Sequence, residues 1–112
     1  MLRERLGALA AEIEVARRLL MHSIAVAESG KVPVHEACMA KVYSGELMER
    51  FGETVLDMLG MGATLSENAP GAIPDNGELE QCLRHSIMYV VGGGTAEILR
   101  TLIASHGLGL PR

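Results

Sequence analysis

The segment VVGGGTAEILR, residues 90–100, contains the residues best suited to hold a ligand. Three adjacent glycines, Gly92, Gly93 and Gly94, separate two stretches of helical character, and inside a helix they cost about 2–3 kcal/mol relative to alanine. Without Cβ atoms, they let a ligand approach the main chain closely. Thr95 and Glu97 would then open a helix whose free N–H groups can bind an anion. The alternative is an ordinary helix break, with Thr95 as N-cap and Glu97 complementing the helix dipole.

Other reactive side chains lack the spacing of a known site. The chain has four histidines, His22, His35, His85 and His106. His35 and Cys38 share one helical face, but two ligands do not complete a metal site, so we predict no metal. No serine lies in a nucleophile-elbow context, which gives hydrolysis no support. Cys38 and Cys82 are expected to be reduced and buried.

The composition favours a helical protein with an aliphatic core. Of 112 residues, 48% are hydrophobic and only 3% are aromatic, which suits helices better than a β-sandwich. A formal net charge of −4 argues against binding to nucleic acid. No run of apolar residues is long enough for a membrane span, and the charged first residues do not resemble a signal peptide. We expect a cytoplasmic protein.

Hydrophobic periodicity predicts long helices. Apolar residues recur at gaps of three and four from Leu2 to Ala27, and Gly30 ends this helix. A second helix is expected from about 34–36 to Gly60, with small residues on it that allow close approach of a neighbour: Ala37, Ala40, Ser44 and Gly45. A loop follows over 60–77, and further helices are expected over 78–91 and 95–105.

These elements predict one all-α domain over residues 1–112, an up-and-down antiparallel bundle. It has three long helical units, the last of them broken at Gly92–Gly94. Three units make a thin bundle, and the first helix is apolar over more than one face. We therefore expect that part of the bundle is supplied by another segment or chain, and that the isolated chain self-associates.

The C-terminal segment GGGTAEILRTLIASHGLGLPR (92–112) resembles the end of flavin-dependent acyl-CoA dehydrogenases. That signature reads Gly-Thr-x-Glu-Ile-x-Arg and is followed by a run ending in Leu-Gly-Leu-Pro. The preceding LRHSIMYVVGGGT also fits, with Arg84 at the arginine of an Arg-Asp pair and His85 in place of the aspartate.

The resemblance extends over essentially the whole chain. LRERLGALAAEIEVARRLLMHSIAVAESGK (2–31) is similar to the second helix of that family's C-terminal domain, and HEACMAKVYSGELMERFGETVLDMLGMGA (35–63) to the next helix and its glycine-rich loop. The resemblance implies a partial C-terminal domain, without its first helix and without the N-terminal and middle domains.

The resemblance also implies a site for FAD and an acyl-CoA thioester in the intact enzyme. Many members carry the catalytic base, a glutamate, where this chain has Gly93; others carry it on the first helix of the domain or have lost it. We therefore predict no catalytic residue in this chain. Backbone groups of Gly93 and Gly94 would bind substrate, and Thr95 and Glu97 would contact the flavin dinucleotide. This chain alone is not expected to retain FAD.

A second cofactor contact is implied for the loop LDMLGMGA (56–63), which in the family reaches the dinucleotide of a neighbouring subunit. Asp57 takes the place of a glutamine and Gly60 matches a glycine. An aspartate would repel a pyrophosphate, so a helix C-cap at Gly60 is an equal alternative.

The predicted function is that of the C-terminal domain of an FAD-dependent acyl-CoA dehydrogenase, inactive as an isolated chain. Such enzymes introduce an α,β double bond into acyl-CoA thioesters during β-oxidation of fatty acids or steroid side chains. The domain would associate as a homo-oligomer, or as a hetero-oligomer with another acyl-CoA dehydrogenase subunit. The alternatives are a non-catalytic helical assembly module or base-less partner subunit, and an unrelated ligand-binding bundle.

Overall fold

The computed structural model describes residues 1–73 and 77–111, and within them it is all-helical, as predicted. The α-helices are α1 (Leu2–Glu28), α2 (Val34–Leu59), α3 (Gly77–Val91) and α4 (Ala96–Leu102). Residues 74–76 of the expected 60–77 loop lie outside the described residues, as does Arg112 at the end of the C-terminal signature.

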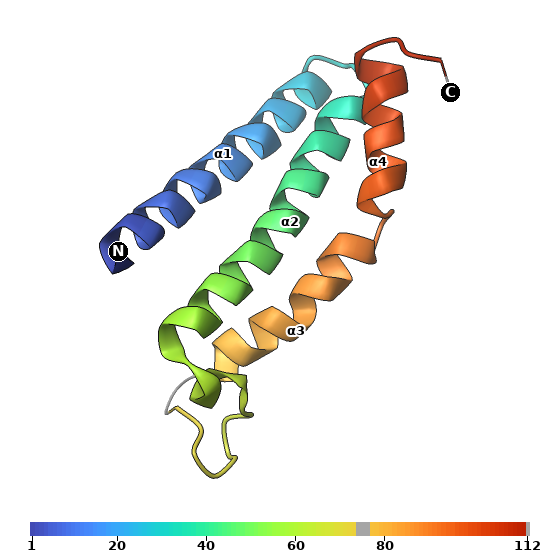
Figure 1. Cartoon of the computed structure of the whole chain (residues 1–112). Helices are drawn as coiled ribbons and strands as arrows, with labels where there is room; N and C mark the ends of the chain where they lie inside the picture. Colours follow the sequence, from blue (N-terminus) through green and yellow to red (C-terminus); the bar gives the residue numbers. More distant parts are fainter. Residues whose placement is uncertain (74–76, 112) are drawn as a thin grey trace.

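The helices form an elongated antiparallel bundle of 52 × 26 × 24 Å (Figure 1). α2 is the central helix and packs against α1, α3 and α4. α3 and α4 together return along α2, and the two helical segments of this last unit are bent by 43° at the glycine break. The prediction of three long helical units with a broken third is confirmed.

Two short irregular helices differ from the expected pattern. A 3₁₀ turn, Met61–Thr64, follows Gly60 directly, inside the segment expected to be a loop. α4 ends at Leu102 and continues as a π-helical turn over Ile103–Gly107. Both lie at the end of a longer helix, where such tightened or widened turns take up carbonyl groups that have no partner.

Only part of the apolar stripe predicted on α1 is buried against α2. Leu9 and Ser23 are the buried residues of this helix. Leu6, Ile13 and Leu20 belong to the same stripe but remain 49%, 51% and 53% exposed. This apolar side of α1 therefore has no partner within the described part of the chain, which agrees with the expectation of a thin bundle.

Glycines on α2 allow α3 to approach closely. Gly45 and Gly52 are both buried in α2. A Cβ atom on Gly45 would lie 3.2 Å from the carbonyl oxygen of Tyr89, and one on Gly52 would lie 2.6 Å from Leu83 Cδ1. The prediction of close approach is thus right for Gly45. By contrast, Ala37 and Ser44 are exposed.

No single helix in the described ranges is long and apolar enough to cross a membrane. α3 and the helical segment Ala96–Gly107 pass the length and composition criteria only as a bent pair.

Replacing Gly45 with valine should weaken the α2–α3 contact. The added methyl groups would meet the Tyr89 carbonyl, and we expect the free energy of unfolding to fall by about 1–3 kcal/mol. Gly7→Val is the matched control, because a Cβ there meets no atom within 4 Å, and its effect should stay within about 0.5 kcal/mol. Urea denaturation measures both. Equal effects at the two positions would contradict close packing at Gly45.

Candidate functional site

The glycine turn between α3 and α4 is built by three glycines with different roles. A Cβ on Gly92 would lie 2.8 Å from the Met88 carbonyl oxygen, so this position has no room for a side chain. Gly93 and Gly94 have φ angles of +78° and +116°, in the region that favours glycine. Close contact and backbone conformation together therefore require glycine throughout the turn.

Gly93 presents an accessible backbone amide. The residue is exposed, and the nearest atom to a Cβ placed on it would be Lys41 Cε, at 3.9 Å. Its N–H forms no hydrogen bond with other described residues, whereas those of Gly92 and Gly94 donate to the carbonyls of Met88 and Val91 at 2.7 and 3.3 Å. A ligand oxygen could therefore reach the Gly93 N–H without displacing a protein group.

The backbone at Gly93 also opposes an acidic side chain. A φ of +78° costs a residue with a Cβ about 1–2 kcal/mol. The conformation of this turn is thus adapted to glycine, and no carboxylate is available at this position to remove a proton.

Thr95 and Glu97 begin α4 in the manner of ordinary capping residues. Thr95 is the N-cap, and its hydroxyl accepts a hydrogen bond from the Ile98 N–H at 3.5 Å. The pKa of Glu97 is lowered because its own backbone N–H and the Thr95 hydroxyl donate to the carboxylate, with a further contribution from the charge of Arg100. The structure shows this capping arrangement, and contact of Thr95 and Glu97 with a flavin stays a prediction.

Lys41 is the residue of the site that sequence reasoning missed. From α2, its Nζ donates hydrogen bonds to the carbonyl oxygens of Tyr89 and, at 3.3 Å, of Gly94. These two carbonyls lie on either side of the glycine break. The available signal was that Lys41 is the one charged residue between positions 37 and 45.

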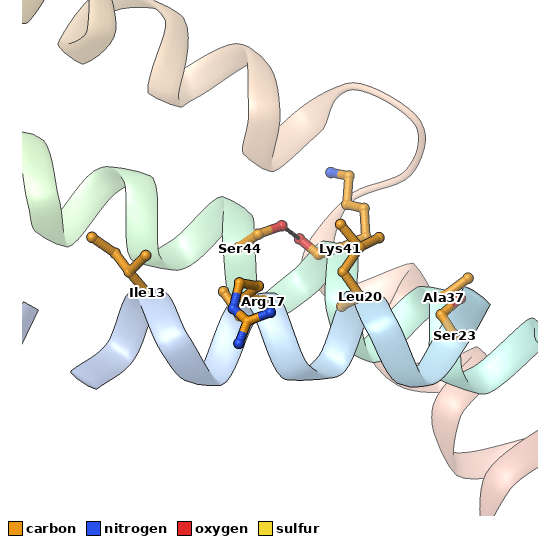
Figure 2. A pocket seen from close by; sticks show the side chains of 9 residues that line it. Ile13, Arg17, Leu20, Ser23, Ala37, Lys41 and Ser44 are labelled. Carbon is orange, nitrogen blue, oxygen red and sulfur yellow. Dashed lines mark hydrogen bonds between the residues drawn. The ribbon is translucent and has the colours of Figure 1, made fainter. Parts of the chain in front are cut away.

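A groove of about 590 Å³ runs between α1 and α2 beside the turn. Figure 2 shows Ile13, Leu20 and Ser44 along it, with the Lys41 side chain extending from its edge. The groove is mostly apolar, with Ala16, Ala37 and Ala40 also lining it. It is therefore suited to cover by an apolar element.

Asp57 and Gly60 lie at the other end of α2. Lys41 and Asp57 are separated by about 24 Å along the helix axis, at about 1.5 Å per residue, so one chain does not bring the two sites together. Asp57 Oδ2 forms an ion pair with Arg5 at 3.0 Å, and Gly60, with a φ of +75°, is the C-cap of α2. The structure thus shows the C-cap alternative, and a cofactor contact here stays a prediction.

Arg84 has an acidic partner on its own helix. Arg84 pairs with Glu80 one turn earlier on α3, at 2.7 Å. The Glu80 carboxylate is largely buried. It is the acidic partner of Arg84 in this chain, whereas the resemblance would place an aspartate at position 85, which here is His85. Among the described residues, no three His, Cys, Asp or Glu side chains form a group that could hold a metal ion.

Comparison with known proteins identifies the family. The acyl-CoA dehydrogenase C-terminal domain family matches residues 1–108. The acyl-CoA dehydrogenase FadE26 of Mycobacterium tuberculosis is 38% identical over 85 residues, which are 76% of this chain and 21% of that protein. The chain belongs to the acyl-CoA dehydrogenase family and corresponds to its C-terminal helical domain, as the resemblance implied.

Two solved structures share the fold. The ChsE4-ChsE5 complex from Mycobacterium tuberculosis superimposes with a TM-score of 0.84 at 34% identity, covering 98% of this chain and 28% of that one. The Tcur3481-Tcur3483 steroid ACAD gives a TM-score of 0.87 at 31% identity, with coverages of 98% and 28%. The chain thus spans under a third of these proteins. The family is generally FAD-dependent, and the first of these neighbours is a complex of two different components.

The capping arrangement predicts how the pKa of Glu97 responds to Thr95. Since the Thr95 hydroxyl stabilises the carboxylate, Thr95→Val should raise the pKa of Glu97 toward its ordinary value of 4.5. The lowered pKa stabilises the fold above that ordinary value, and this contribution is lost as the pH falls through the lowered pKa. A carboxyl ¹³C NMR titration measures the shift. Thr101→Val is the control, because that hydroxyl donates to the Glu97 backbone carbonyl instead. The same pKa in both variants would contradict the arrangement.

Proposed function

We propose that this chain acts as the C-terminal domain of an FAD-dependent acyl-CoA dehydrogenase and that its glycine turn binds the substrate thioester. The observation that carries the proposal is the backbone amide of the exposed residue Gly93, which has no partner among the described residues. A fixed backbone N–H can stabilise the negative charge that develops on a thioester oxygen when the α-carbon loses a proton.

The chain supplies binding and orientation rather than proton transfer. FAD, when bound, would accept the hydride from the β-carbon. Removal of the α-proton requires a carboxylate base, and Gly93 occupies the position where many members of the family carry one. The base would have to come from a segment or subunit outside these 112 residues, and the isolated chain would be inactive.

The flavin contacts are proposed for both ends of α2. Thr95 and Glu97 would face the dinucleotide beside the glycine turn. At the other end, Gly60 has open space on its Cα, and the ion pair with Arg5 partly neutralises Asp57. Because Arg5 offsets the charge of Asp57, this loop could lie near a pyrophosphate of a neighbouring subunit with less repulsion than the sequence suggested.

The substrate class that we favour is a CoA thioester with a bulky steroid side chain. One structural neighbour is named as a steroid ACAD, and its helical domain superimposes on almost the whole chain. A fatty acyl-CoA is the alternative within the same reaction class.

A second candidate function is that of a base-less partner subunit in a hetero-oligomer. The missing carboxylate at Gly93 favours it, because such a subunit needs a backbone site without an acid. The structural neighbours, which are complexes of two named components, also support it. In that case the bundle would contribute mainly to assembly.

The binding role of the turn predicts a specific loss on Gly93→Ala in the complete flavin-binding protein or complex that contains this chain. The added Cβ would lie 3.9 Å from Lys41 Cε and would take up space that the thioester needs, so we expect Kd for an acyl-CoA to rise at least about tenfold, or roughly 1.4 kcal/mol. Gly30→Ala is a matched control, since Gly30 has a similar φ of +81° and a Cβ there would meet no atom within 4 Å. Isothermal titration calorimetry measures both. Equal affinities in the two variants would contradict the proposed site, and no binding by the unmodified protein would contradict the function.

Self-association through the exposed side of α1 is a further expectation. Leu20→Glu would place a charge beside the groove between α1 and α2, so burial of this face would become unfavourable and the variant should be monomeric. Val15→Glu, also in α1 and 45% exposed but away from the groove, should leave association unchanged. Sedimentation velocity distinguishes the species. A monomeric unmodified chain at high concentration would contradict the expectation.

A further inference from the structure

The ammonium group of Lys41 bridges the two sides of the glycine break. It donates to the Tyr89 carbonyl in the last turn of α3 and to the Gly94 carbonyl immediately before the N-cap of α4. Figure 2 shows the side chain leaving α2 and ending near the loop that joins the two helices. One cation thus contacts the last turn of α3 and the last glycine of the turn, next to the N-cap of α4.

The end of α3 favours a cation that α3 itself does not provide. The last turn of this helix contains no basic residue, although its free carbonyls and the helix dipole favour positive charge there. Hydrogen bonds from a charged donor to carbonyls are stronger than those between neutral groups. Lys41 therefore supplies from α2 the charge that a lysine or arginine at the end of α3 would otherwise supply.

Gly45 makes this contact possible. It lies one helical turn after Lys41, and the absence of a Cβ lets the Tyr89 carbonyl approach α2, with 3.2 Å between that oxygen and the position of a Cβ. Gly45 and Lys41 thus act on the same carbonyl group, one by leaving space for it and the other by donating to it.

Acidic residues near Lys41 are not its partners. Glu46, further along α2, accepts a hydrogen bond from Arg100 of α4, and no carboxylate within the described ranges forms an ion pair with Lys41. The donor capacity of Lys41 is therefore directed to the main chain of the turn.

We propose that Lys41 is a positioning residue that holds the glycine turn in the conformation in which Gly93 is exposed and its N–H has no partner among the described residues. Without the ammonium, the carbonyls of Tyr89 and Gly94 would lose their shared donor, and the segment between them would open locally. The consequence for thioester binding rests on the proposed function, whereas the effect on the turn does not.

Hydrogen exchange of the 112-residue chain, followed by NMR, tests the positioning role. In Lys41→Met, the amides of Gly92 and Gly94 should exchange at least about tenfold faster, because a charged hydrogen-bond donor is lost. Amides of α1 should keep their rates. Lys41→Arg, which retains a cationic donor, should restore most of the protection. The other lysine of the chain, Lys31, is exposed in the loop before α2, and Lys31→Met should leave the turn unchanged.

Two results would overturn the proposal. Unchanged exchange at Gly92 and Gly94 in Lys41→Met would show that the contact does not hold the turn. A uniform increase that includes α1 would show a general loss of stability instead of local positioning. Neither measurement involves flavin or thioester, so its outcome is independent of the Gly93→Ala binding experiment.

The contact of Lys41 can also be tested on the unmodified chain, which does not depend on whether a variant folds. Because its amine is engaged by two carbonyls, Lys41 should react with acetic anhydride at least about tenfold more slowly than Lys31, as quantified by mass spectrometry. Equal reactivity of the two lysines would contradict the contact. In the complete flavin-binding protein, Lys41→Met should weaken thioester binding and Lys41→Arg should recover it.

Discussion

The carbonyl group of Tyr89 lies between Gly45 and the ammonium of Lys41, and the position of the glycine turn depends on this contact. α2 is the helix against which α1, α3 and α4 all pack. Because α3 approaches it through glycines, the end of α3 comes within reach of a lysine that otherwise would point into solvent. Packing between α2 and α3 thus determines where the three-glycine segment begins, and Lys41 contacts the carbonyl at its end.

In the function that we propose, the turn would separate two parts of a dehydrogenation, binding of the thioester and removal of the proton, which in many members of the family involve one residue. A backbone N–H at Gly93 can bind the thioester oxygen whatever the side chain, whereas proton abstraction needs a carboxylate there or elsewhere. The left-handed backbone at Gly93 leaves the N–H available for binding and disfavours a residue with a carboxylate side chain at this position. The absence of a base at position 93 and the positive φ of this glycine agree with the proposed domain, which binds the thioester while another segment or subunit provides the acid–base group.

Local sequence patterns predicted the helices well because each one depends on periodicity, glycine and proline within a short stretch. The partners of charged side chains could not be predicted in the same way. Lys41 reaches Gly94, 53 positions away, and Arg5 reaches Asp57, 52 positions away, and such contacts depend on how whole helices pack. For the same reason, periodicity on α1 identified an apolar stripe but could not show that only part of it, including Leu9, is buried.

Binding of a thioester oxygen by the Gly93 amide can be observed directly. The most direct measurement is a crystal structure of the complete flavin-binding protein or complex with a non-reactive acyl-CoA analogue bound. Our account predicts the thioester carbonyl oxygen at about 2.9 Å from the Gly93 nitrogen, with Lys41 still in contact with Tyr89 and Gly94. A thioester bound away from the turn, or a Gly93 N–H directed into the protein, would contradict it.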